Sequence, residues 1–195
     1  MIGLPSARLA LSLIINAAWA VFFAYWIWAA RHRNKARRRE PAGERILHIL
    51  WLGFGFYLLY ADEPWLGRLN NAFVRDKFWV AALGALFTVA GIAFAIWARA
   101  HLGRYWSAEV TIRAEHKLIR TGPYKYIRHP IYTGLLLAIL GSAVAIGKYR
   151  GLVAFAIFAL GWSHKAQKEQ SYLAQEFGPA FEEHKRRTGF FLPRL

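Results

Sequence analysis

The segment His116–Gly134, HKLIRTGPYKYIRHPIYTG, carries most of the side chains with which this chain could do chemistry. It holds two histidines, two lysines, two arginines and three tyrosines, directly before an apolar run that starts at Ile131. Arginine and histidine bind anions through charge-assisted hydrogen bonds, and tyrosine rings offer faces to a planar ring or a cation. Ionisable residues held against a membrane helix are a functional-site hypothesis by default. The segment therefore predicts a ligand-binding site.

Two prolines shape the backbone of this segment. Gly122-Pro123 predicts a turn, and Pro130 disfavours a helical conformation at His129. Arg128 and His129 are therefore expected on irregular backbone at a helix N-terminus, where free N–H groups bind a carboxylate or a phosphate. Taken one at a time, such residues more often serve as interfacial anchors or structural histidines. Their combination is what favours a site.

The composition predicts an all-α integral membrane protein. Hydrophobic residues make up 56% of the 195, and they cluster in blocks that carry almost no charge. Blocks of this kind are typical of membrane-spanning helices. About five transmembrane helices are expected, the last two forming a tight helical hairpin, in a single domain over residues 1–195. The expected helices cover about residues 7–30, 46–61, 78–98, 131–147 and 152–163.

The basic residues lie between the apolar blocks, and their distribution predicts an orientation. Residues 31–45 and residues 99–130 each hold seven basic against two acidic residues, whereas residues 61–77 are balanced. By the positive-inside rule the N-terminus is expected outside, and residues 99–130 and the C-terminus in the cytoplasm. In a prokaryote the membrane would be the plasma or inner membrane. The net charge of +15 fits attraction to anionic membrane lipids better than nucleic-acid binding, so no nucleic-acid partner is predicted.

The C-terminal tail is expected on the same side as the segment 116–134. Residues 165–187 show a broken apolar stripe, which predicts a cytoplasmic amphipathic C-terminal helix interrupted near Gly178-Pro179. This helix would place Lys165 and Glu169 opposite the segment.

Other kinds of site are disfavoured by what the sequence lacks. The chain has no cysteine, which excludes disulfides, thiolate metal ligands and a cysteine nucleophile. Its seven histidines show no metal-binding spacing, so no metal is predicted. Neither a glycine-rich phosphate loop nor a dinucleotide fingerprint is present.

Three motifs in the second half of the chain resemble a known family. They are LGRYWS at 102–107, HKLIRTGPYKYIRHPIYTG at 116–134 and KEQSYLAQEFGPAFEEHKRRTGFFLP at 168–193. Over about residues 99–193 the chain is similar to the isoprenylcysteine carboxyl methyltransferase family and to its relatives among the phospholipid N-methyltransferases. The resemblance implies a membrane-embedded enzyme that uses S-adenosyl-L-methionine. Residues 99–195 would then be the cofactor-binding catalytic part, and residues 1–98 three N-terminal transmembrane helices.

The resemblance also implies roles for individual residues. The implied catalytic residues are Arg128, His129, Lys165 and Glu169. The implied cofactor-binding residues are His116, Lys117, Leu118, Ile119, Gly122, Tyr124, His129, Pro130, Ile131, Tyr132 and Glu169. The chain departs from the family pattern at two positions. Gln170 stands where a second glutamate is usual, and Lys165 stands where an arginine is usual, which keeps the charge without the bidentate fork.

The expected acceptor is a lipophilic molecule that enters between the helices from the bilayer, as in isoprenylcysteine carboxyl O-methylation. A carboxylate acceptor needs no general base, whereas an amine would need His129 or Glu169 to remove a proton. Methylation of a phospholipid ethanolamine is the first alternative. A membrane reductase that uses a reduced nicotinamide dinucleotide and a non-catalytic scaffold or transporter are more distant ones.

Overall fold

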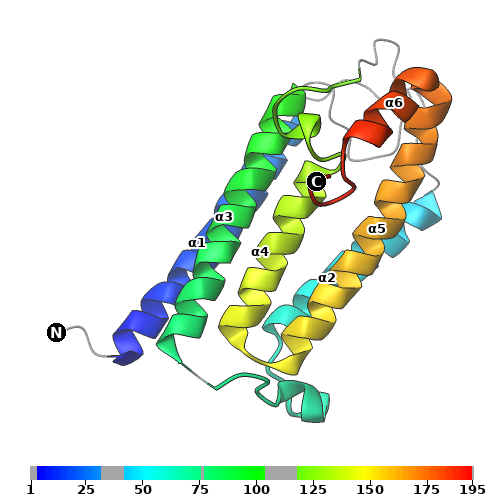
Figure 1. Cartoon of the computed structure of the whole chain (residues 1–195). Coiled ribbons are helices and arrows are strands. Elements are labelled where there is room, and N and C mark those ends of the chain that lie inside the picture. Colours follow the sequence, from blue (N-terminus) through cyan, green and yellow to red (C-terminus); the bar gives the residue numbers. More distant parts are fainter. Residues whose placement is uncertain (1–3, 32–41, 76, 104–117, 195) are drawn as a thin grey trace.

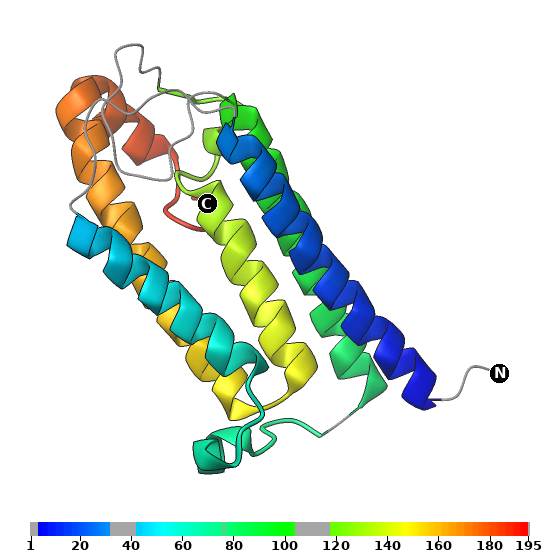
Figure 2. The same cartoon turned by 180° about the vertical axis from the view of Figure 1, so that it is seen from behind.

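The computed structural model describes residues 4–31, 42–75, 77–103 and 118–194, and these form a bundle of helices (Figures 1 and 2). Long helices run side by side, and α6 lies across the end of the bundle at which α4 begins. The elements in chain order are α1 (Leu4–Arg31), α2 (Ala42–Tyr60), the 3-10 helix η1 (Pro64–Asn70), α3 (Phe78–Leu102), the 3-10 helix η3 (Gly122–Lys125), α4 (Pro130–Ile146), α5 (Tyr149–Phe177) and α6 (Pro179–Arg187).

The expectation of an all-helical protein is confirmed, since each of the five apolar blocks forms a helix. Two of the described helices, over Ser6–Arg31 and Phe78–Leu102, are long and apolar enough to cross a membrane. The apolar parts of α2 and α4, Ile46–Tyr60 and Pro130–Ile146, are shorter. The number of five crossings and the orientation therefore stay predictions.

Helices α3 and α4 pack with their backbones in contact. Glycines seven residues apart form a stripe on each helix, Gly84 and Gly91 on α3 and Gly134 and Gly141 on α4. A Cβ atom added at Gly91 would lie 2.5 Å from the backbone nitrogen of Ala138, closer than any real contact. Small residues allow this close approach. Helices in a membrane associate through such packing contacts, because lipid supplies no hydrophobic driving force between them.

A buried polar cluster crosses the same interface. Trp19 of α1 donates its indole N–H to the hydroxyl of Ser142 at 3.0 Å, and Thr88 Oγ1 lies 3.2 Å from the same hydroxyl. Each hydroxyl is also bonded to a carbonyl four residues earlier in its own helix. The cluster therefore satisfies its polar groups internally, as an apolar environment requires.

The hairpin expected at residues 131–163 forms, but its second arm is longer than predicted. Gly147 takes the left-handed conformation, with φ of 68°, and ends α4. α5 then continues for 29 residues without a break, about 43 Å at ~1.5 Å per residue. The prediction of a separate tail helix from residue 165 is wrong, because no glycine or proline stands between Ser163 and Phe177 to end the helix. The predicted break is confirmed at Gly178, with φ of 48°, followed by Pro179 as the first residue of α6.

Candidate active site

His129 lies at the N-terminus of α4 on non-helical backbone, with φ of −123° and ψ of 57°. The following Pro130 is the first helical residue, because its ring fits that position and disfavours a helical conformation before it. His129 is 6% exposed, and its backbone N–H donates to the carbonyl of Phe190 at 3.3 Å. The irregular backbone predicted here is thus confirmed.

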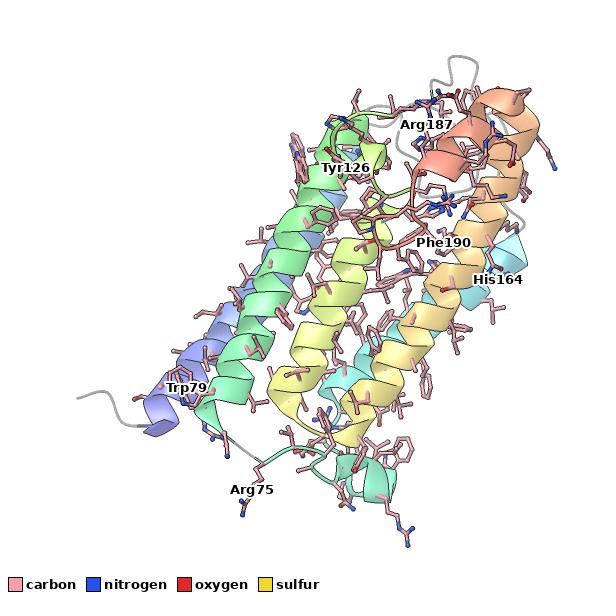
Figure 3. The ribbon with its side chains drawn as sticks, in the orientation of Figure 1. Arg75, Trp79, Tyr126, His164, Arg187 and Phe190 are labelled. Atoms are coloured by element: carbon pink, nitrogen blue, oxygen red, sulfur yellow. The ribbon has the colours of Figure 1, made fainter. Side chains whose placement is uncertain are left out.

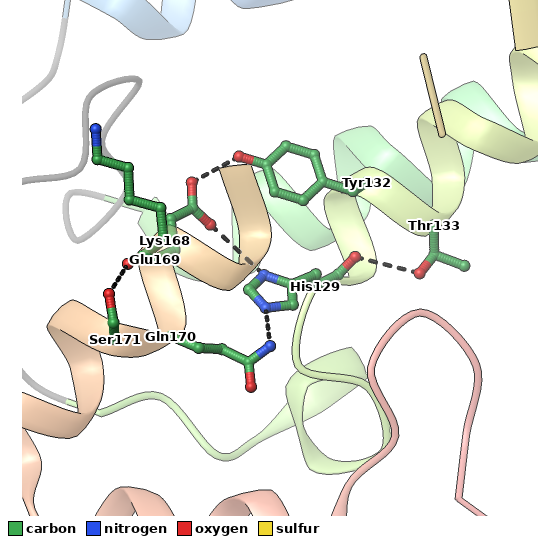
Figure 4. A network of polar contacts seen from close by, with 7 residues as sticks. All are labelled: His129, Tyr132, Thr133, Lys168, Glu169, Gln170 and Ser171. Atoms are coloured by element: carbon green, nitrogen blue, oxygen red, sulfur yellow. Dashed lines mark hydrogen bonds and ion pairs between the residues drawn. The ribbon is translucent and has the colours of Figure 1, made fainter. Parts of the chain in front are cut away.

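The start of α4 and the C-terminal third of α5 meet through a polar network (Figure 4). Tyr132 donates its hydroxyl hydrogen to Glu169 Oε1 at 2.6 Å. His129 Nδ1 lies 3.5 Å from Glu169 Oε2, and the amide nitrogen of Gln170 lies 3.2 Å from His129 Nε2. Two short stretches that are 37 residues apart therefore meet at one carboxylate.

His129 has a partner at each ring nitrogen. Nε2 faces the side-chain amide of Gln170. Nδ1 faces the carboxylate of Glu169, and the hydrogen bond from His129 stabilises the ionised form of that carboxylate. Both ring nitrogens are thereby engaged.

The Glu169 carboxylate is held in its ionised form. Burial acts to raise its pKa, but the hydrogen bond and charge of His129, the charge of Lys165 and the hydrogen bond from Tyr132 outweigh burial and lower the pKa below its ordinary 4.5. The side chain is 25% exposed, so part of the carboxylate faces outward. At neutral pH the site therefore presents a fixed negative charge.

Aromatic rings surround the histidine and the carboxylate. The His129 ring stacks on Tyr132 with centroids 5.9 Å apart, and Tyr132 stacks on Trp162 of α5 at 6.0 Å. Phe190 meets His129 edge-on at 5.1 Å. These rings form an apolar wall against which a planar group could stack.

Arg128 points away from the carboxylate, towards the end of α6. Its guanidinium donates to the carbonyl of Lys185 at 2.8 Å and also to the carbonyl of Thr188. Burial, followed by the charge of Arg194, lowers the pKa of Arg128. Carbonyls at a helix C-terminus lack intrahelical partners, so this placement favours a structural role for Arg128.

The other predicted residues lie around this network. Lys165 is half-buried one turn before Glu169, and its charge acts on that carboxylate. Pro130 and Ile131 are buried where α4 starts, and Tyr124 is buried with its hydroxyl 3.4 Å from the carbonyl of Ala98.

The loop before η3 is described only in part. Leu118 and Ile119 are half-buried, and Gly122 begins η3 with φ of 57°, a conformation that favours glycine. His116 and Lys117 lie outside the described residues. The roles assigned to these side chains stay predictions.

Three contributors were not predicted from the sequence. Gln170 was noted only as a departure from the family pattern. The C-terminal strap, residues 188–194, folds back along residues 126–133. There the backbone N–H of Arg128 donates to the carbonyl of Gly189, and Thr133 Oγ1 donates to the carbonyl of Phe191 at 2.6 Å. His48 of α2 lies within electrostatic range of Lys165 and Glu169. The third motif contains both Gln170 and most of the strap, so both had a signal in the sequence, whereas His48 had none.

The network does not resemble a metal centre. Among the residues that the structure describes, no group of three or more His, Asp or Glu side chains is placed to hold a metal ion. The arrangement instead combines one ionised carboxylate, a hydrogen-bonded imidazole and stacked rings, a set suited to an organic ligand that carries hydroxyls or a positive charge.

Residues 83–175 match the sequence profile of the isoprenylcysteine carboxyl methyltransferase (ICMT) family. This part of the chain is similar to the ICMT family. His129, Tyr132, Glu169 and Gln170 all lie inside the matched range.

Curated relatives match over a similar part of the chain. The cobalt-zinc-cadmium resistance protein CzcN of Cupriavidus metallidurans is 34% identical over 122 residues, which cover 62% of this chain and 54% of that protein. Protein-S-isoprenylcysteine O-methyltransferase B of Arabidopsis thaliana is 29% identical over 125 residues, which cover 62% of each. The chain thus spans between half and two thirds of these two relatives.

A solved structure shares the fold. The eukaryotic intramembrane Ras methyltransferase ICMT matches with a TM-score of 0.51 at 18% identity, covering 79% of this chain and 53% of that chain. At this identity the match shows the fold of a membrane-embedded helical protein, and it agrees with the helical bundle of Figure 1.

Proposed function

We propose that this chain is a methyltransferase that uses S-adenosyl-L-methionine to O-methylate the carboxylate of a lipophilic acceptor. The observation that carries the proposal is the His129–Tyr132–Glu169 network. It joins two motifs of the ICMT family into one site, inside the range that matches the family. Relatives named protein-S-isoprenylcysteine O-methyltransferase point to an S-prenylated cysteine as the acceptor class.

The residues present fit this cofactor. S-adenosyl-L-methionine supplies a methyl group bonded to a positively charged sulfur. An ionised, partly exposed carboxylate at Glu169 suits hydroxyl donors or a nearby positive charge, and the rings of His129 and Tyr132 suit a planar base. By the family resemblance, His116 to Ile119 would contribute a further wall.

The role of the chain in catalysis is mainly to position the reactants. Holding two reactants in line can contribute about 7–11 kcal/mol to lowering a barrier. Tyr132 and His129 fix the Glu169 carboxylate, and Lys165 offers a cation to an acceptor carboxylate. The buried His129 and the adjoining aromatic wall keep water from this side of the site.

The hydrogen bonds of His129 favour a carboxylate acceptor over an amine. An amine must lose a proton when it is methylated, and a side chain must take that proton. Nε2 of His129 is already engaged by the amide of Gln170, and both oxygens of Glu169 already have donors. A carboxylate arrives without a proton, so it needs no base at this site.

We further propose five membrane-embedded helices, with the site on the cytoplasmic side. The seven-to-two excess of basic residues in 31–45 and in 99–130 supports this orientation. The chains of a prenylated acceptor would reach the site from the bilayer, between helices that expose apolar side chains such as Ile27, Leu47 and Leu50.

Transfer of a radiolabelled methyl group tests the function directly. Purified protein, radiolabelled S-adenosyl-L-methionine and an S-farnesylated cysteine with a blocked amine are expected to give an apolar labelled product. Mild alkali is expected to release that label as methanol, because an ester hydrolyses where an N-methyl group does not. Label that resists alkali, or that appears only in ethanolamine lipids, would contradict the carboxyl assignment. Thermal stabilisation by a reduced nicotinamide dinucleotide, but not by S-adenosylhomocysteine, the product of the cofactor, would contradict the methyltransferase class.

Removing a single hydroxyl tests the network. Tyr132→Phe keeps the stacked ring and deletes the hydrogen bond to Glu169. Hydrogen bonds to charged groups are worth about 1.5–3 kcal/mol, so calorimetry should show S-adenosylhomocysteine binding weakened by at least about tenfold. Tyr149→Phe, at the exposed start of α5, is the matched control and should bind within twofold. Equal affinities for both variants would remove Tyr132 from the site.

A further inference from the structure

A second charged feature lies beside the active site and is not used by it. Arg128, Lys185, Arg186 and Arg194 line a cavity of about 430 Å³, together with a single carboxylate, Glu182. We name this cavity the basic pocket. Its cations come from the start of α4, from α6 and from the C-terminal strap.

The charges of the basic pocket are only partly compensated from within. Glu182 is 3.8 Å from Lys185, one turn along α6. The charge of Arg194 is close enough to lower the pKa of Arg128, after the larger effect of burial. Arg128 Nε is buried and has no hydrogen-bond partner among the described residues. Cations that are held close together repel one another, and the buried donor of Arg128 lacks an acceptor. An anion bound in the pocket would offset the repulsion and supply that acceptor.

In the membrane arrangement proposed above, the pocket lies at a membrane surface. Arg128 precedes α4 by two residues, at the end of the bundle where α3 stops. Figure 3 shows Tyr126, Phe190 and Arg187 at this end and Arg75 at the opposite end. Interfacial aromatic residues and arginines gather at the level of lipid headgroups.

Apolar side chains adjoin the cations. Leu192 on the strap is 73% exposed, and Tyr126 is 56% exposed. The Arg128 guanidinium lies 5.8 Å from the centre of the Phe190 ring. A ligand that is anionic at one end and apolar at the other would contact both groups, whereas a soluble phosphate would contact only the cations.

We propose that the basic pocket binds the phosphate headgroup of an anionic phospholipid. The lipid would hold the strap and α6 against the bundle, because Arg128 and Arg194 bond to backbone carbonyls of α6. The strap in turn packs Phe190 and Phe191 against His129. The inference does not depend on the proposed reaction, since it rests on a pocket outside the Glu169 network.

Titration of the detergent-solubilised chain with three probes tests the proposal. The probes are short-chain phosphatidylglycerol, short-chain phosphatidylcholine and glycerol phosphate, with binding measured by native mass spectrometry. One molecule of phosphatidylglycerol is expected to bind saturably, at least about tenfold more tightly than the other two. Equal binding of glycerol phosphate would overturn the lipid assignment in favour of a soluble phosphate ligand, and no saturable binding would overturn the pocket.

Single substitutions distinguish a specific lipid-binding pocket from a general electrostatic attraction of the basic surface to anionic lipid. Lys185→Gln and Arg194→Gln should each weaken phosphatidylglycerol binding at least about fivefold, the typical contribution of a basic residue near anionic lipid. Arg187→Gln is the matched control, because Arg187 is on the same helix, lies outside the pocket and is paired with Glu183 at 2.6 Å. Its loss should change affinity less than twofold, and a loss equal to that of Arg194→Gln would overturn the proposal. The thermal midpoint of each variant, measured without lipid and compared with that of the unsubstituted chain, shows whether the variant folds. If Arg194→Gln does not fold, the result for Lys185→Gln decides the test.

Discussion

Glu169→Gln is expected to lower S-adenosylhomocysteine affinity by at least about thirtyfold and to remove detectable methyl transfer. The substitution keeps the size of the side chain and removes its charge. Tyr132 and His129 both donate to this carboxylate, and truncating one partner of a buried, hydrogen-bonded charge pair costs about 2–5 kcal/mol. Calorimetry gives the affinity, and the radiolabel assay gives the activity.

Glu176→Gln supplies the control for this experiment. Glu176 lies two turns further along α5 and is exposed, so its substitution makes the same chemical change outside the network. It should leave affinity within about twofold of the unsubstituted chain. If Glu169→Gln behaved like Glu176→Gln, the carboxylate would have no part in cofactor binding, even if the chain still transferred methyl groups.

Much of this architecture follows from local signals in the sequence. Uncharged blocks predict the helices, because backbone groups in lipid must be bonded within the segment. Gly178-Pro179 predicts the break before α6, since glycine permits positive φ and proline starts a helix well. The distribution of charged residues predicts that the segment 116–134 and the C-terminal tail lie on the same side of the membrane. The contact of Glu169 with His129 and Tyr132 agrees with that prediction.

The features that the sequence did not predict depend on contacts between distant residues. The sequence places Arg128 beside His129, but the side chain turns to the carbonyls at the end of α6, 57 and 60 residues further on. Nothing near Arg128 in the chain specifies those partners. The hydrogen bond of Gln170 to His129 is similar, because it depends on the register of α4 against α5.

The glycine stripe between α3 and α4 is a signal that the sequence did contain. Glycines at 84 and 91, and again at 134 and 141, repeat at seven residues, which is nearly two helical turns. Each pair therefore lies on one face of its helix. Small residues with this kind of periodicity favour close helix contact in membranes. The stripe positions the site, because α4 carries both His129 and Tyr132 at its start.

Gly91→Leu is expected to prevent the bundle from folding, and Gly91→Ala to weaken it. A Cβ at Gly91 would lie 2.5 Å from the backbone of Ala138 and of Gly134, and backbone atoms cannot move aside as a flexible side chain can. Overpacking costs about 1–3 kcal/mol, and more where the backbone must shift. Gly91→Ala should therefore lower the thermal midpoint in detergent by at least about 5 °C, at roughly 2–4 °C per kcal/mol for a chain of this size. Gly91→Leu should lose its monodisperse peak in size-exclusion chromatography.

Gly53 of α2 provides the comparison that isolates packing from helix propensity. A Cβ at Gly53 meets no atom within 4 Å, and the residue is exposed in the middle of an apolar helix. Gly53→Ala and Gly53→Leu make the same changes with no backbone in the way, and alanine is favoured over glycine inside a helix by about 1 kcal/mol. Both should leave the thermal midpoint unchanged or raise it. If the Gly53 and Gly91 variants unfolded at the same temperature, backbone contact between α3 and α4 would not hold the site in place.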